Sequence, residues 1–190
     1  MAERRTTGAH RAPGRPRPAA AIGALVLVAA VAGVAMGPPS IRSPEVGRIQ
    51  ALRALSGLEP LIHRRHAVVR AELLPALDRA SRTAADDHLI QRRGPRWLDA
   101  LAAIRARWRA IAVPEELGET KELFLLALDG SLAAARSLVV ATESTRTRRA
   151  QLIRTAADES QAAERLWDQA VQRARSDLGR LGVSAPGWLR

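Results

Sequence analysis

The sequence contains no cysteine. This absence excludes a disulfide bond, a thiolate metal site, a cysteine nucleophile and a lipid-modified cysteine, so the chain is not a lipoprotein. It leaves the redox compartment open, because a chain without thiols is compatible with oxidising and reducing surroundings alike.

Tyrosine is also absent, and the aromatic side chains are four Trp and one Phe. Lysine occurs once, at Lys121, and every other basic residue is arginine. Aromatic and β-branched runs are scarce, whereas Ala, Leu, Arg and Glu are abundant, which predicts an all-α protein. A length of 190 residues allows one ordinary domain and an appendage.

The most apolar stretch runs from Ala19 to Met36 and has no charged or strongly polar side chain. As a helix of eighteen residues it would be about 27 Å long, close to the ~30 Å of a membrane hydrocarbon core. Five arginines precede it: Arg4, Arg5, Arg11, Arg15 and Arg17. Because guanidinium groups resist translocation, we expect the N-terminus in the cytoplasm and the chain after residue 36 outside it.

Two other interpretations of this stretch stay open. Small residues such as Ala30-Val31-Ala32 offer cleavage positions, which would make it a signal peptide and the protein secreted. It could also be the core helix of a soluble protein, although an arginine-rich leader is untypical of one. The run exceeds the usual signal core of about 7–15 residues, so we favour a retained transmembrane helix.

The expected organisation has five parts: a disordered basic cytoplasmic arm over 1–18, a transmembrane helix over 19–36, a linker over 37–43, an extracytoplasmic helical bundle over 44–182 and a tail over 183–190. Residues 37–190 carry 25 basic and 18 acidic residues. The acids are spread throughout, which predicts a mixed surface with a basic bias.

Proline, glycine and polar residues predict where helices begin and end. We expect helices over about 44–56, 58–82, 95–112, 114–141 and 152–181. Gly57 should end the first, Pro75 should kink the second, and a connector over 83–95 should precede the third. Gly179 or Gly182 should cap the last helix, after which Trp188 could dock on the bundle. The fold class is therefore a four- to five-helix bundle with a long C-terminal helical hairpin.

The clearest core face lies on the helix expected over 95–112. Its apolar residues recur every three or four positions: Trp97, Leu101, Ile104, Trp108 and Ile111. The arginines beside Trp108 would also suit a nucleic-acid surface. We favour tryptophans in the core with arginine stems along its rim, and no nucleic-acid partner.

The helix before residue 141 is apolar on nearly every side but carries Asp129 and Arg136, which disfavour a second membrane span. We expect it at the centre of the bundle. Asp129 could be a buried functional carboxylate. Alternatively, Asp129-Gly130-Ser131 could mark a kink or a side-chain-to-backbone hydrogen bond. On the last helix, Arg173 and Asp177 should pair across the outer face.

His63 and His66 are weak candidates for a metal site, because two imidazoles one turn apart supply half of one. Di-metal bundles use Glu-x-x-His, whereas Glu59 precedes His63 by four positions. His66 lies beside Ile62 and Val69, which favours a histidine at the edge of the core. No phosphate-binding loop, nucleophile elbow or zinc-protease motif occurs in the sequence, so we expect no enzyme, metal or cofactor.

The order "RIQALRALSGLEPLI … W … VPEELGETKELFLLAL … ESQAAERLWDQAVQRARSDL" resembles a group of uncharacterised bacterial single-pass membrane-anchored helical proteins of unknown function. They share a similar Val-Pro-x-x-Leu helix start and an Ala-rich final helix. The resemblance covers about two thirds of the chain and implies architecture, with no activity or site.

The sequence thus favours a non-catalytic interaction or scaffold module of the cell envelope, with an envelope protein as its possible partner. A second hypothesis is electrostatic binding of an anionic envelope polymer or lipid. A third is a metal-binding or catalytic helical bundle that uses His63 and His66.

Overall fold

A computed structural model describes residues 44–189 of the chain. These residues form an all-α fold without strands. The chain divides between Pro39 and Ser40, and all described residues belong to the unit that follows this point. The predicted basic arm, transmembrane helix and linker lie outside the described residues.

The first rod of the bundle is nearly continuous. It consists of α1 (Pro44–Val68), a π-helical turn η1 (Val69–Leu73) and α2 (Leu74–Arg82). Pro75 has no N–H, and its ring crowds the carbonyl four residues earlier, so an ordinary α-turn is disfavoured there. The helix widens into a π-turn instead, in which the N–H of Leu74 donates to the carbonyl of Val69. The irregularity expected at Pro75 is therefore present, as a π-turn.

The predicted helix end at Gly57 is wrong, because α1 passes through Gly57 and Pro60 without a break. Pro60 has no N–H to donate to the carbonyl of Ser56, so one helical hydrogen bond is absent. Ser56 is exposed, so water can reach that group. The buried residues on both sides of Pro60, such as Leu58 and Leu61, hold the two parts in one helix.

The predicted connector over 83–95 is also wrong beyond its first residues. Helix α3 (Asp87–Ala110) begins at Asp87 and includes Gly94 and Pro95. Gly94 is buried where α3 packs on α4, and a Cβ there would overlap Cγ2 of Val139. The glycine thus allows a close approach of two helices. Four of the five residues in the expected seam are buried, which confirms it: Trp97, Leu101, Ile104 and Trp108.

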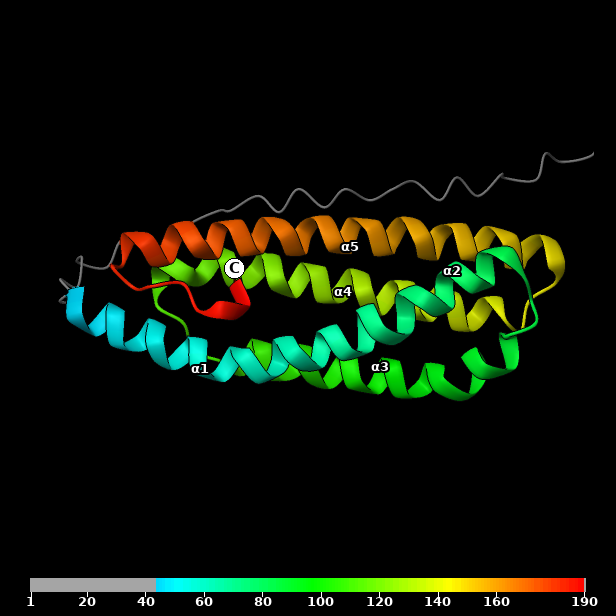
Figure 1. Cartoon of the computed structure of the whole chain (residues 1–190), viewed down its shortest axis with the longest axis horizontal. Coiled ribbons are helices and arrows are strands. Elements are labelled where there is room, and N and C mark those ends of the chain that lie inside the picture. The colour runs from blue at the N-terminus through cyan, green and yellow to red at the C-terminus, as the bar shows by residue number, and fades with distance from the viewer. Residues whose placement is uncertain (1–43, 190) are drawn as a thin grey trace, which may run out of the picture. The chain divides into compact units, whose positions relative to one another are not determined.

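The second half of the bundle is a long helical hairpin. A short 3₁₀ turn η2 (Glu115–Leu117) leads into α4 (Gly118–Ala141), and α5 (Arg146–Arg180) runs back along it. The four rods alternate in direction, and α4 lies between α3 and α5 (Figure 1). Among the described residues, 115–141 is the one helical stretch long and apolar enough to cross a membrane. Half of its most apolar window is buried inside the bundle, which fits the predicted central helix.

Small residues on α5 bring it close to α4. Those that are buried recur along one face: Ala156, Ser160, Ala163, Ala170 and Ala174. At Gly130 a Cβ would lie only 3.0 Å from the Cβ of Ala163. The large side chain of Trp167 fills space in the core beside these small residues. Its ring centroid lies 4.8 Å from that of Phe124 and 5.9 Å from that of Trp108. This aromatic cluster occupies the middle of the core.

The C-terminal segment returns to the bundle. Gly182 has φ +64°, and the N–H of Val183 bonds to the carbonyl of Leu178, as in a glycine-capped helix end. The last 3₁₀ turn η3 (Gly187–Leu189) brings Leu189 into the core with none of its surface exposed. Figure 1 shows this segment folded back beside α1.

Candidate functional site

A buried arginine, Arg65, lies where α1 faces α5. Its side chain is fully buried, and its Cζ lies 3.9 Å from the centroid of the Trp167 ring. Its Nη2 donates to Oε1 of Glu164, whereas Nε and Nη1 have no hydrogen-bond partner. The other oxygen of Glu164 accepts from Nη2 of Arg70 at 3.2 Å. An aromatic face and a single carboxylate therefore hold this cation.

The buried surroundings of Arg65 and His66 disfavour the charged forms of both side chains. Burial lowers the pKa of Arg65, and the charge of Glu164 opposes that effect. Next to it, burial and then the charges of Arg65 and Arg70 lower the pKa of His66. The His66 ring lies 6.0 Å from Trp167, and its Nε2 has no partner. The lowered pKa favours the neutral imidazole, and His66 lies at the edge of the core, as the sequence predicted for its position.

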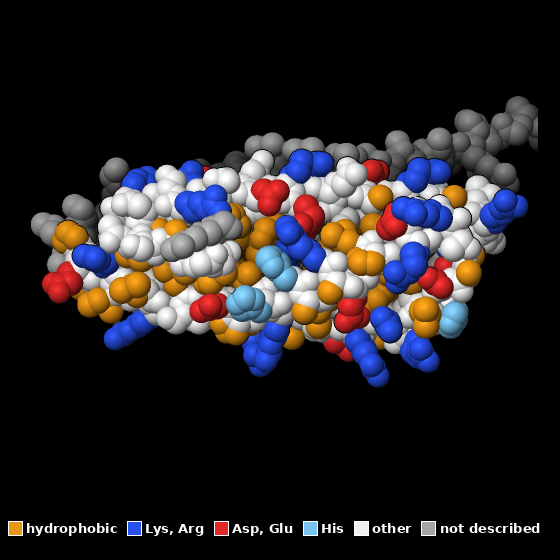
Figure 2. All heavy atoms as spheres, viewed as in Figure 1, with side chains coloured by type: hydrophobic (Ala, Val, Ile, Leu, Met, Phe, Trp, Pro, Cys, Tyr) orange, Lys and Arg blue, Asp and Glu red, His pale blue; other side chains and the backbone are white. Residues whose placement is uncertain are grey.

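The two candidate metal ligands have different surroundings. His63 is exposed, and its Nε2 lies 3.9 Å from Oε1 of Glu59 on the same helix. His66 packs instead beside Trp167. Histidine side chains are visible side by side on the surface near the middle of the bundle (Figure 2). Within residues 44–189 no group of three or more His, Cys, Asp or Glu could hold a metal ion.

Asp129 is not a buried carboxylate, which corrects that hypothesis. Its side chain is 45% exposed and pairs with Arg105 of α3, whose Nη2 donates to Oδ2 at 3.0 Å. This hydrogen bond raises the pKa of Arg105. The predicted local hydrogen bond is present, because Oγ of Ser131 donates to the carbonyl of Ala127 at 2.9 Å. Helix α4 continues through this point.

The buried carboxylate of the bundle is Asp177, which has no exposed side-chain surface. It accepts hydrogen bonds from Oγ1 of Thr120 at 2.7 Å and from Nε of Arg173 at 3.1 Å. Nη2 of Arg180 supplies a further donor. The predicted pair with Arg173 is therefore confirmed, but it lies at the interface of α4 and α5 and not on the outer face.

Arg149, at the start of α5, makes contacts between helices at the end of the bundle opposite to Asp177. Its Nε and Nη2 each lie 2.8 Å from a carboxylate oxygen of Asp87, a bidentate pair. Nη2 also donates to the carbonyl groups of Ala80 and Thr83. Hydrogen bonding to Asp87 raises the pKa of Arg149. One side chain thus joins three helices.

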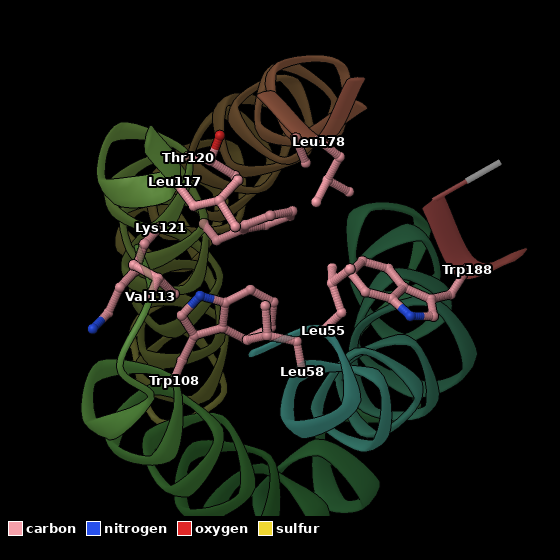
Figure 3. A pocket seen from close by; sticks show the side chains of 11 residues that line it. Leu55, Leu58, Trp108, Val113, Leu117, Thr120, Lys121, Leu178 and Trp188 are labelled. Carbon is pink, nitrogen blue, oxygen red and sulfur yellow. The ribbon is translucent and has the colours of Figure 1, made fainter. Parts of the chain in front are cut away.

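A small apolar cavity lies near the C-terminal segment, between α1, α3, α4 and α5 (Figure 3). Trp108 and Trp188 face it from different sides, and the amine of Lys121 points away from it. That amine donates to the carbonyl groups of Arg109 and Ile111 at the end of α3. The cavity has a volume of about 20 Å³, room for roughly one water molecule. It does not admit an organic substrate.

Sequence reasoning missed Arg65 and Asp177 as buried groups. A signal was present at Arg65, which follows Ile62 by three positions and precedes Val69 by four, and so shares their face. Its partners could not be read from the sequence, because the α1–α5 pairing joins residues about a hundred positions apart.

Comparison with protein-family models, with curated proteins and with solved structures finds no match to this chain. The resemblance stated from the sequence therefore stays a prediction.

Proposed function

We propose that the protein is a membrane-tethered, non-catalytic helical module that contacts another component of the bacterial cell envelope. The observation that carries the proposal is that charged side chains at the helix interfaces pair with one another across those interfaces. Arg65 with Glu164, Arg105 with Asp129, and Arg149 with Asp87 are such pairs. Charged groups paired in this way hold neighbouring helices together, which supports a structural role for them.

Exposed apolar side chains support an outward-facing role. On α4, Leu126 and Val140 are exposed, with 53% and 43% of their surface in solvent. These two residues are fourteen positions apart and lie close to one face of the helix. Tethering by residues 19–36 would keep that surface close to the membrane.

Photo-cross-linking in native membranes tests this function. The full chain would carry a photoreactive residue at Leu126 or Val140, with the exposed polar position Arg107 on α3 as the matched control. We expect a discrete adduct with an envelope protein from the α4 positions and a weaker one or none from Arg107. Full-length protein that forms no adduct at any of the three positions would contradict the proposal.

An electrostatic function is the second candidate, because α3 has a strongly basic exposed surface. Its exposed basic residues are Arg92, Arg93, Arg96, Arg107 and Arg109. Basic side chains project along the lower edge of the view in Figure 2. Such a surface attracts anionic polymers or lipid headgroups, and salt screens that attraction.

Binding of the full chain to inorganic polyphosphate, measured at increasing salt, tests the second candidate. We expect affinity to fall with salt and to fall further in the R92Q/R93Q/R96Q variant. The matched control is R146Q/R148Q/R154Q, at exposed positions in the first turns of α5. Affinity that does not change with salt would refute the electrostatic function.

A further inference from the structure

The first turns of α1 expose an apolar stripe. Of the large hydrophobic side chains exposed in the described part of the chain, three lie here: Val46, Ile49 and Leu52, at 43%, 45% and 50% exposure. They are spaced three apart, so they are neighbours on one helix face. We refer to these three residues as the α1 stripe. Hydrophobic side chains are visible at the end of the bundle where α1 begins (Figure 2).

The position of the stripe in the chain indicates what covers it. Helix α1 begins at Pro44, and the predicted transmembrane segment ends at Met36, so seven residues separate them. Such a linker reaches at most about 25 Å. A membrane tether in the predicted segment would therefore hold the start of α1 near the membrane surface.

The charges beside the stripe suit a lipid surface. Arg48 and Arg53 are exposed on the turns that carry it. Arginines at a lipid interface lay their stems along apolar surface and place their guanidinium groups among phosphates. Glu45 is the one acidic residue in the first turn of α1, where its negative charge interacts favourably with the positive end of the helix dipole.

We propose that the α1 stripe docks on the outer surface of the membrane, so that Val46, Ile49 and Leu52 enter the boundary between headgroups and acyl chains. This inference rests on the proposed membrane tether. Three side chains bind lipid weakly, but the tether supplies a high effective concentration of membrane. The result is a bundle held against the bilayer along the start of α1.

The absence of cysteine makes depth measurement direct. In the full chain, a single cysteine would replace Ile49, Leu126 or Val28 and would carry a nitroxide spin label. The protein would be reconstituted into phosphatidylethanolamine–phosphatidylglycerol vesicles, and accessibility to oxygen and to a nickel chelate would be measured at each position. Leu126 is the matched control because it is an exposed apolar residue on α4.

We expect the oxygen-to-nickel accessibility ratio at Ile49 to exceed that at Leu126 several-fold, with Val28 higher still. Equal, water-like ratios at Ile49 and Leu126 with a lipid-like Val28 would overturn the docking while the tether stands. A label at Ile49 shielded from both reagents would also overturn it, in favour of contact with a second copy. A water-like ratio at Val28 would overturn the tether and the docking together.

Discussion

At the scale of single residues, this protein keeps charge in its interior at a cost. Arg65 is fully buried, yet two of its three nitrogens have no hydrogen-bond partner. A buried cation without a partner is expensive because its hydration is lost. The Trp167 face and the Glu164 carboxylate offset part of that cost. Such a pair specifies how α1 meets α5 more than it stabilises the fold.

This balance can be measured with Glu164→Leu and with the double variant Arg65→Met/Glu164→Leu. The single variant leaves a buried cation unpaired and should lose stability near the lower end of about 3–5 kcal/mol, since Glu164 is partly exposed. The double variant should lie within about 1 kcal/mol of the unmodified protein. Urea denaturation of the full chain in detergent would report both. A double variant less stable than the single one would show that Arg65 is stabilising by itself.

His66 should make stability depend on pH. Its pKa is lowered in the folded state by burial and by the two neighbouring arginines, so the unfolded chain binds more protons below about pH 6.5. The free energy of unfolding should therefore fall as pH drops from about 7.5 towards 5.5. His66→Gln should remove part of that fall, whereas His63→Gln, at an exposed position, should retain it. Identical pH profiles for the two variants would contradict this assignment.

At the scale of elements, the sequence predicted which helix faces are buried better than it predicted where the helices begin and end. Four of the five residues expected in the seam of α3 proved buried, because burial follows helical periodicity directly. Gly57-x-x-Pro60 and Gly94-Pro95 were read as boundaries from local preference, and both lie inside helices. The carbonyl groups freed by Pro60 and Pro95 belong to Ser56 and Gln91, which are exposed, so water can satisfy them. Packing on both sides then outweighs a local penalty of about 3 kcal/mol.

Gly94 shows that a helix glycine can be required by packing. Gly94→Ala should destabilise the protein by about 1–3 kcal/mol, because the new Cβ overlaps the stiff side chain of Val139. In a Val139→Ala background the same change should raise stability by up to about 1 kcal/mol through helix propensity. Gly179→Ala, which meets nothing within 4 Å, is the control and should be neutral or stabilising. Thermal unfolding of the four variants gives the comparison, and an equal loss from Gly94→Ala in both backgrounds would contradict it.

At the scale of the molecule, the described bundle closes through contacts that local patterns do not reveal. Asp177 joins α4 to α5, and Arg149 joins α5 to the α2–α3 connection. The tail adds a third closure, since Leu189 is buried and its carbonyl accepts a hydrogen bond from Nε of Arg175. The sequence predicted the helical hairpin and the possible docking of Trp188. It could not predict these closures, because each depends on which faces meet in three dimensions.

These closures give a prediction for the bundle as a whole. Because the core is built from residues after Ser40, a fragment of residues 40–190 should fold without the preceding segment. We expect a helical circular dichroism spectrum and a single cooperative transition in urea. Within that fragment, Leu189→Ala should cost about 2–5 kcal/mol, as for other buried leucines, whereas Leu126→Ala at an exposed site should change stability by less than about 0.5 kcal/mol. A broad, non-cooperative transition would show that the bundle depends on the segment before it. Equal effects of the two substitutions would show that the tail does not close the core.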